Sequence, residues 1–329
     1  MNTVEALVCV EPGSLLLTRR PAPECRPGQA LVRPRRAGIC GTDYHIFEGK
    51  HPFLQYPRIM GHELAVEVVE SSAGSPFSPG DVCVVNPYIS CGDCVACLNG
   101  KPNCCVRISV LGVHQDGGMT ERLAIPESNL VPSGGLTIDE CATVEFLAIG
   151  AHAVRRGSAG AGDRILVVGA GPIGLGVALF ARLSGGEVTV LDIDPERGEA
   201  AEAVARVSAA EAADADGYDL VFDATGNPKA MESGFGYVAH GGRYVLVSVV
   251  KEPITFQDPD FHRKEMTLFA SRNATTEDFE RVIAAIRNGD VPVDRLITHR
   301  TSLADAQRNI PLWAIEKSGL IKALIEIGE

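Results

Sequence analysis

The chain has 329 residues, too many for one ordinary hydrophobic core and enough for two domains. Hydrophobic residues make up 45% of it and charged residues 22%, which is typical of a soluble globular protein. The net charge of −12 disfavours nucleic acids and anionic membranes as partners, because binding to phosphate depends on clustered Lys and Arg.

The N-terminal segment MNTVEALVCVEPG lacks a basic region followed by a long apolar core, so we expect no secretory signal. The longest uncharged apolar run, between Arg164 and Arg182, is slightly short for a membrane-spanning helix of about 20 residues. Its four glycines and one proline favour a strand, a turn and a helix instead. We therefore expect a cytoplasmic protein with no membrane segment, where clustered cysteines bind metal more often than they form disulfides.

The first 150 residues alternate short β-like runs with Gly/Pro turns, as in ALVCVEPG, QALVRPRRAG, ELAVEVVESSAG and GDVCVVNP. This pattern predicts a mostly antiparallel β domain with irregular loops. Potential ligands and polar groups are scattered through it: Cys40, Thr42, Asp43 and His45 in GICGTDYHIFEG, and His62 and Glu63 in IMGHELAVEVVE. Each has an ordinary structural explanation, and none of them alone predicts a catalytic role.

Five cysteines are crowded into the fifteen residues of CGDCVACLNGKPNCC. Cys91, Cys94 and Cys97 are spaced C-x2-C-x2-C, and either Cys104 or Cys105 supplies a fourth thiol. Four thiolates close a tetrahedral zinc shell and leave no position for a substrate, so the spacing predicts a structural zinc site. A redox pair in CGDC is disfavoured because further thiols crowd the same loop.

Glu145 is a lone carboxylate in TVEFLAIGAHAV, an otherwise apolar helical segment. The small-residue joint GSAGAG follows at residues 157–162, and from there strands and helices alternate. The expected strands are DRILVVGAG, EVTVLDID, YDLVFDATG and GGRYVLVSV, with a helix from about Pro172 to Leu183 after the first. Such alternation is typical of an α/β fold, a doubly wound parallel sheet of the Rossmann type.

VVGAGPIG places three glycines in G-x-G-x-x-G spacing around Pro172 and Ile173. Gly169 permits the tight turn, Gly171 lets the backbone approach a pyrophosphate, and Gly174 allows close packing of helix on strand. The helix N-terminus then offers N–H groups and a positive dipole to the phosphates. We therefore predict a dinucleotide site.

The acidic residue that binds the ribose is either Asp192 or Asp194. Asp194 is better placed as the N-cap of a helix whose first residue is Pro195. Asp192 lies close to the expected distance from the glycines, and its carboxylate would accept ribose hydroxyls and repel a 2′-phosphate. We predict NAD over NADP, although Arg197 could instead pair with a 2′-phosphate.

The tail returns to short β runs, with a helix near Leu303–Glu316 and a final strand in IKALIEIGE, and we expect it to pack on the first domain. The predicted organisation is a catalytic domain at 1–150 with a structural-zinc lobe at about 90–106, a nucleotide domain at 151–288, and a return to the catalytic domain at 289–329.

Together and in this order, GICGTD, GHE, the four-cysteine lobe, GAGPIG and LDID resemble the zinc-dependent medium-chain alcohol dehydrogenases. The resemblance spans essentially the whole chain and implies a GroES-like catalytic domain, two zinc ions per subunit, and a homodimer or homotetramer. It assigns the fourth structural ligand to Cys105. One departure is that the segment between Val207 and Tyr218 is shorter than in most relatives, so we expect part or all of one helix to be missing.

The same resemblance implies the catalytic roles. Cys40 and His62 would bind a catalytic zinc, with Glu145 bound directly or through water and Glu63 as an alternative ligand. Thr42 and His45 match the family's proton-relay positions.

The segment VEFLAIG around Glu145 resembles the polyol branch of the family. GKHPFLQYPRIMGHE, VLGVHQDGG and LFASRNAT are most similar to bacterial sugar-acid dehydrogenases such as the L-galactonate and L-gulonate 5-dehydrogenases. We therefore expect NAD-dependent oxidation of a sugar acid to a keto acid. The candidates for its pocket are His114, Gln115, Arg272 and Asn273. The alternatives are a sorbitol-type polyol dehydrogenase and, more remotely, a non-catalytic zinc- or nucleotide-binding protein.

Overall fold

The computed structural model describes residues 3–51, 54–210, 212–316 and 318–328 and divides into two compact units. Unit 1 comprises residues 1–145 and 283–329, and unit 2 comprises residues 146–282. The two boundaries fall inside helices, α4 (Val144–Arg156) and α9 (Thr276–Arg287), whereas the sequence placed the divisions at 150 and 288.

Unit 1 is built on mostly antiparallel sheets, as the short β runs predicted. Its strands are β1 (Thr3–Glu11), β2 (Ser14–Pro21), β3 (Gln29–Ile39), β4 (Arg58–Ile59), β5 (Glu63–Ser71), β6 (Val82–Val85), β7 (Tyr88–Ile89), β8 (Ser109–Val110), β9 (Leu123–Pro126), β10 (Leu130–Pro132), β17 (Ile297–Ser302) and β18 (Lys322–Glu326). Its helices are α1 (Gly41–Phe47), α2 (Val95–Leu98), α3 (Ile138–Cys141), α10 (Val293–Leu296) and α11 (Leu303–Ile315), with 3-10 turns at Pro102–Cys104 and Glu127–Asn129.

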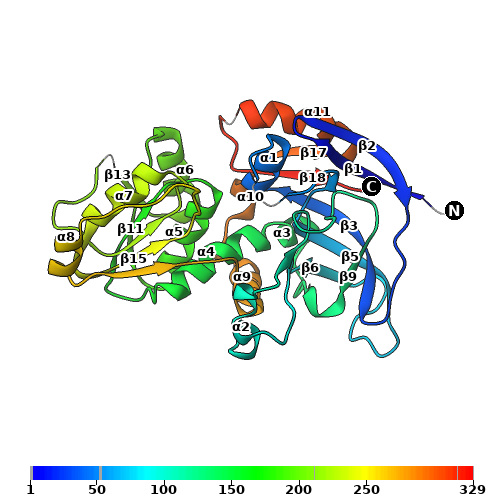
Figure 1. Cartoon of the computed structure of the whole chain (residues 1–329), viewed down its shortest axis with the longest axis horizontal. Coiled ribbons are helices and arrows are strands. Elements are labelled where there is room, and N and C mark those ends of the chain that lie inside the picture. The colour runs from blue at the N-terminus through cyan, green and yellow to red at the C-terminus, as the bar shows by residue number, and fades with distance from the viewer. Residues whose placement is uncertain (1–2, 52–53, 211, 317, 329) are drawn as a thin grey trace. The chain divides into compact units, whose positions relative to one another are not determined.

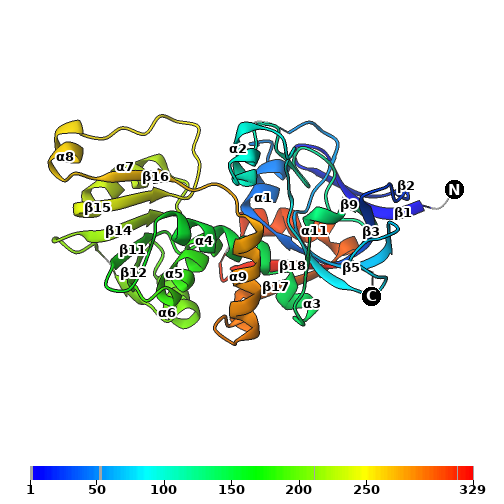
Figure 2. The ribbon, with the colours of Figure 1, turned by 90° about the horizontal axis from the view of Figure 1, so that it is seen from below.

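The C-terminal tail completes the main sheet of unit 1. The strand order is β10-β6-β5-β3-β18-β17, with β9 also paired to β3, and Figure 2 shows the C-terminal strands beside those of the N-terminal half. β18 is antiparallel to β3, while β17 and β18 form a parallel pair. Buried side chains of both halves, including Val66 and Ile325, share one hydrophobic cluster, so the tail is part of this unit's core.

Unit 2 contains a six-stranded, wholly parallel sheet in the order β13-β12-β11-β14-β15-β16. Its strands are β11 (Arg164–Val168), β12 (Glu187–Leu191), β13 (Ser208–Ala210), β14 (Tyr218–Asp223), β15 (Val238–Leu246) and β16 (Thr267–Ala270), and its helices are α5 (Pro172–Leu183), α6 (Pro195–Ala205), α7 (Pro228–Tyr237) and α8 (Asp258–Arg263) (Figure 1). The predicted α/β fold, a Rossmann-type sheet beside an antiparallel-rich domain, is confirmed.

The order of the strands reverses between β11 and β14. The chain leaves β11 toward β12 and β13, then returns to add β14, β15 and β16 on the other side of β11. Because such crossovers are right-handed, α5 and α6 cover one face of the sheet and α7 covers the other. The crevice at the carboxyl ends of β11 and β14 is where doubly wound folds bind ligands.

The shortened segment between Val207 and Tyr218 carries no helix among its described residues, 208–210 and 212–217, of which 208–210 form β13. In the described part of the chain, no helix combines the length and apolar character that crossing a membrane requires.

Candidate active site

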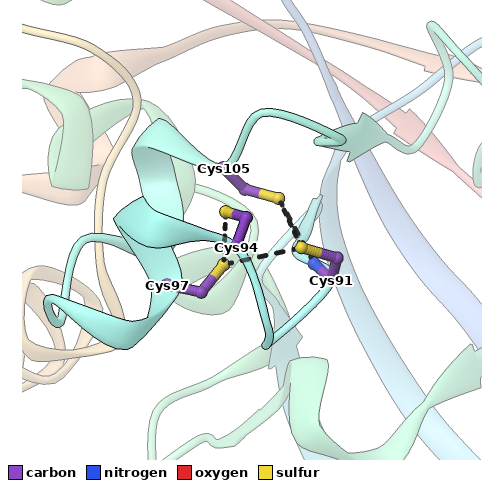
Figure 3. Close-up of side chains that lie close together, drawn as sticks. All are labelled: Cys91, Cys94, Cys97 and Cys105. Atoms are coloured by element: carbon purple, nitrogen blue, oxygen red, sulfur yellow. Dashed lines mark hydrogen bonds between the residues drawn. The ribbon is translucent and has the colours of Figure 1, made fainter.

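The four cysteines of the lobe converge in unit 1, with their sulfur atoms facing one another (Figure 3). The Sγ–Sγ distances are 3.3 Å for Cys91–Cys105, 3.5 Å for Cys94–Cys97 and 3.9 Å for Cys91–Cys97. A zinc ion with Zn–S bonds of about 2.3 Å needs tetrahedral edges of about 3.8 Å, so this arrangement fits zinc closely. Cys104 is exposed and lies outside the group.

Backbone N–H groups around the lobe favour the thiolate forms of two of the four cysteines, Cys94 and Cys105. Hydrogen bonds from the backbone at Cys97 and Val106 lower the pKa of Cys94 to about 6. The backbone N–H of Cys91 donates to Cys105 Sγ at 3.3 Å and lowers the pKa of that thiol as well. Part of the charge of a four-thiolate site is thus offset by the local fold.

A second potential ligand group in unit 1 consists of Cys40, His62 and Glu63. Cys40 is the N-cap of α1, His62 precedes β5, and Glu63 is the first residue of β5. One ligand atom from each lies within 4.8 Å of the others. His62 and Glu63 are buried and Cys40 is half-buried, so most of the group is shielded from solvent.

Asp43 is fully buried beside this group and organises it. Its Oδ2 accepts the backbone N–H of Cys40 at 2.9 Å, and its Oδ1 lies 3.9 Å from His62 Nδ1. Burial lowers the pKa of His62, but the charges of Asp43 and Cys40 outweigh it and raise that pKa well above the usual value. The negative charges of Asp43 and Cys40 therefore favour a cation at this position, and a bound metal ion would be stabilised by the same charges.

Glu63 is already paired. Lys322 Nζ, from β18, donates to both carboxylate oxygens at 2.7 Å, and both side chains are buried. Gly38 makes room for the carboxylate, because a Cβ there would lie 2.1 Å from Glu63 Oε2. Glu63 therefore has its charge neutralised and both oxygens engaged.

Glu145 is buried in the first turn of α4, and only one of its oxygens is engaged. Tyr88 donates its hydroxyl to Oε1, while Oε2 is buried without a hydrogen-bond partner. Burial raises the pKa of Glu145 to about 7, against the opposing charge of His62. Glu145 falls outside the compact group formed by Cys40, His62 and Glu63, yet it interacts electrostatically with His62.

Thr42 and His45 lie on α1, immediately after Cys40. Their spacing of three residues puts them on one face of the helix. Thr42 is half-buried and His45 is exposed, so the pair runs from the ligand group toward solvent.

The glycine-rich loop of unit 2 has the geometry that its spacing predicts. Gly169 has a φ of +93°, and a Cβ on Gly174 would lie 1.8 Å from the carbonyl oxygen of Gly169. Gly171, the N-cap of α5, has nothing within 4 Å of its missing Cβ, and Pro172 follows as the first helical residue. The half-buried Ile173 completes the loop. Two positions thus exclude side chains, and the third leaves the backbone open to a phosphate.

Asp192 and Asp194 have different roles in unit 2. Asp194 caps α6 by accepting the N–H of Glu196 at 3.0 Å, and Arg197 Nε lies 3.7 Å from Asp194 Oδ2. Asp192 Oδ2 accepts the N–H of Ala170 at 2.6 Å, which ties it to the glycine-rich loop. Its Oδ1 accepts the N–H of Asp194 at 2.9 Å, and because a carboxylate has about four acceptor sites, two remain for ribose hydroxyls.

Comparison with known proteins identifies the family. The alcohol dehydrogenase GroES-like domain matches residues 26–135, and the zinc-binding dehydrogenase domain matches residues 172–288. The chain is 40% identical to L-galactonate-5-dehydrogenase of Escherichia coli K12, over 99% of each chain. The protein belongs to the zinc-type medium-chain alcohol dehydrogenases.

Two further relatives support this membership. The chain is 29% identical to a sorbitol dehydrogenase of Halalkalibacterium halodurans, over 98% of this chain and 99% of the relative. A solved alcohol dehydrogenase, RspB of E. coli CFT073 complexed with NADH, matches with a TM-score of 0.93 and 28% identity over 99% of this chain and 100% of that one. The predicted family, enzyme class, zinc and nicotinamide cofactors are therefore confirmed.

The residues present fit the metals of a medium-chain dehydrogenase. Four facing sulfur atoms suit a structural zinc. Near the second group, Oε2 of Glu145 is a buried atom without a hydrogen-bond partner, and Glu145 interacts electrostatically with His62. Buried polar atoms are rarely left unpaired, so an ion held by Cys40, His62 and Glu145 would account for this oxygen.

The substrate candidates belong to different units of this dehydrogenase. In unit 1, His114 Nδ1 accepts the N–H of Val110 at 3.1 Å, and Gln115 Nε2 donates to Ser109 Oγ at 2.7 Å. In unit 2, Arg272 is exposed, while Asn273 has a φ of +54° and a buried Nδ2 without a hydrogen-bond partner.

Sequence reasoning missed Tyr88 and Lys322. A lysine within the apolar strand IKALIEI is a signal, because a buried ammonium requires an acidic partner. Tyr88 carries no such signal, since a tyrosine near a turn has many ordinary explanations.

Proposed function

We propose that this dehydrogenase oxidises a secondary alcohol of a sugar acid with NAD, giving a keto acid. The catalytic part rests on the second ligand group, which offers Cys40, His62 and a carboxylate. Three protein ligands would leave one position on a zinc ion open for a substrate, whereas the four cysteines of the quartet would leave none. The similarity to L-galactonate-5-dehydrogenase supports the sugar-acid part.

In this proposal Cys40, His62 and Glu145 hold the catalytic zinc, directly or with a water in the case of Glu145. Glu145 is preferred over Glu63, because Lys322 already engages both oxygens of Glu63. The bound ion supplies a Lewis acid that lowers the pKa of a bound alcohol, and the nicotinamide supplies the hydride acceptor.

The chain's own residues then move the alcohol proton. Thr42, half-buried two residues after Cys40, takes it as the first member of a relay. His45 lies on the same face of α1 and is exposed, so it releases the proton to solvent.

Asp192 supports NAD as the cofactor. Its carboxylate is held at the glycine-rich loop by Ala170, where it would accept ribose hydroxyls and repel a 2′-phosphate. Arg197 is engaged 3.7 Å from Asp194, which makes it less available for a 2′-phosphate. We further propose that the protein is a homodimer or homotetramer. We also propose that it acts in a reducing cytoplasm, in keeping with its ten free cysteines.

Arg272 is the proposed partner of the substrate carboxylate, and a polyol dehydrogenase is the alternative. The experiment is NAD reduction measured against a panel of hexonates, pentonates and neutral polyols. For a sugar acid, Arg272→Ala should raise KM at least tenfold, since a charged hydrogen bond contributes about 1.5 to 3 kcal/mol.

The matched control is Arg263→Ala, which removes another exposed arginine of unit 2 and should leave KM unchanged. Turnover of neutral polyols alone, with no effect of Arg272→Ala, would assign the enzyme to the polyol branch.

A further inference from the structure

We propose that Tyr88 is a positioning residue for Glu145: its hydroxyl holds Oε1 so that Oε2 is the oxygen presented to the catalytic metal. This role rests on the proposed function and deepens it. The carrying observation is the asymmetry of one buried carboxylate, in which Oε1 accepts from Tyr88 and Oε2 has no hydrogen-bond partner.

The backbone of Tyr88 is fixed on several sides. Its N–H donates to Asn86 Oδ1 at 3.1 Å, and it pairs with Val110 in the small β7–β8 sheet. The neighbouring carbonyl of Pro87 accepts the N–H of Leu111 at 3.1 Å. The hydroxyl is therefore placed by the fold before the catalytic metal binds, and little conformational freedom is lost when it engages the carboxylate.

A neutral donor suits this position. Lys322 neutralises Glu63 and occupies both of its oxygens. Tyr88 occupies one oxygen of Glu145 and adds no positive charge, so it does not neutralise the carboxylate that a cation would bind. Tyr88 is also buried, at 8% exposure, so its hydrogen bond is not exposed to competing water.

The arrangement also links the two metal sites along the chain. Only Ile89 and Ser90 separate Tyr88 from Cys91, the first ligand of the structural quartet. The lobe held by the quartet therefore anchors the strand that carries the hydroxyl.

Tyr88→Phe tests the role because it removes only the hydroxyl. Loss of a hydrogen bond to a metal ligand typically costs 10- to 100-fold in metal affinity. We expect that loss for the catalytic zinc, measured by chelator competition, while the zinc of the quartet is retained. We also expect the visible absorption of the cobalt-substituted catalytic site to change. An affinity within twofold of the wild type with an unchanged cobalt spectrum would overturn the proposal.

Tyr244→Phe is the matched control. It removes a buried tyrosine hydroxyl in unit 2 that donates to the carbonyl of Met231 at 2.8 Å, and it should leave both metal affinities unchanged. If it weakens the catalytic zinc as strongly as Tyr88→Phe does, the effect is general and the proposal is wrong.

A double-mutant cycle separates positioning from other effects. If Tyr88 acts through Glu145, adding Tyr88→Phe to Glu145→Gln should cost no further affinity. A further tenfold loss would show that Tyr88 acts elsewhere. Should Tyr88→Phe fail to fold, a crystal structure of the zinc-loaded wild type decides the matter: Oε1 on the metal, with Tyr88 turned away, contradicts the proposal.

These measurements need no substrate. A wild type that binds two zinc ions but oxidises no alcohol would refute the proposed function and leave the Tyr88 result standing. An active enzyme whose Tyr88→Phe variant keeps wild-type zinc affinity would support the proposed function and refute the role of Tyr88.

Discussion

At the scale of single residues, the ion pair between Glu63 and Lys322 lies beside Cys40 and His62, the proposed catalytic ligands. Both side chains of the pair are buried, and the charge of Glu63 outweighs burial to raise the pKa of Lys322. Such a pair contributes little net stability over apolar residues, yet removing one partner leaves a buried charge uncompensated.

Lys322→Met should therefore destabilise unit 1 by about 3 kcal/mol, measured by urea unfolding. Adding Glu63→Gln should recover much of the loss, because the orphaned charge is removed. Equal stability of the wild type and Lys322→Met would show that Glu63 finds another partner, the catalytic metal being the nearest candidate.

The relay predicts a specific effect of Thr42. Thr42→Val removes the hydroxyl but keeps the shape, so zinc content should stay at the wild-type value while kcat falls by about 100-fold or more, as for loss of a proton-transfer group. Thr42→Ser keeps the hydroxyl and should retain most of the activity. Unchanged turnover in Thr42→Val would refute the relay.

At the scale of elements, the cysteine lobe is a loop with little core of its own. Val95, Leu98 and Val106 are exposed, and the short helix α2 has no buried residue. Zinc therefore has to supply the stability of this segment, and structural zinc sites contribute on the order of 10 kcal/mol.

Two neighbouring cysteines provide a matched test of the lobe. Cys105→Ser should lose one zinc equivalent and make the lobe sensitive to proteolysis, because Cys105 Sγ lies in the quartet. Cys104→Ser should change neither property, because Cys104 is exposed and outside it. Loss of zinc in Cys104→Ser, with zinc retained in Cys105→Ser, would assign the fourth structural ligand to Cys104 instead.

Within unit 2, the buried carboxylate of Asp278 joins α9 to α4. Asp278 contacts His152 Nδ1 at 2.8 Å and accepts from Arg155 Nε at 2.8 Å. It also accepts the N–H of Thr275 at 2.9 Å at the start of α9. Burial raises the pKa of Asp278, but hydrogen bonds with His152 and Arg155 outweigh it and hold the pKa well below its usual value.

This depressed pKa fixes the sign of a pH effect. The stabilisation is fully present above the unfolded-state pKa of about 4 and is lost as the pH falls toward the folded-state value. Asp278→Asn should lower the free energy of unfolding by about 2 to 3 kcal/mol at pH 7. The difference in melting temperature between this variant and the wild type should narrow below about pH 4. A gap that stays constant down to pH 3 would contradict this.

At the scale of the whole molecule, the two metal sites differ in kind. The quartet consists of four cysteines, whereas the second group offers Cys40 and His62 with a carboxylate, and Glu145 Oε2 lies unpaired near it. We expect two zinc equivalents per chain. A chelator should remove the catalytic ion first, abolishing activity while the circular dichroism spectrum is retained. Full activity with a single equivalent would remove the basis of the proposed function.

Much of the fold was predictable because its signals are local. The helix expected from Pro172 to Leu183 has those bounds, since proline, glycine and apolar spacing act within a few residues. The glycine-rich loop is predictable for the same reason, because the positive φ of Gly169 and the contact of a Cβ on Gly174 with the Gly169 carbonyl are both local. The cysteine quartet spans only residues 91–105, so the spacing of the cysteines is enough to predict that they cluster.

The catalytic surroundings depend on contacts between distant segments. Tyr88 and Glu145 are 57 residues apart, and Glu63 and Lys322 are 259 apart. Whether a carboxylate is neutralised or left free depends on which side chain the tertiary packing brings to it, and on how completely the packing excludes water. The sequence alone thus determined the family, the fold class and the ligand types. Tertiary structure decided which carboxylate remains available to a metal, because burial and pairing of charges arise only when the strands and helices assemble.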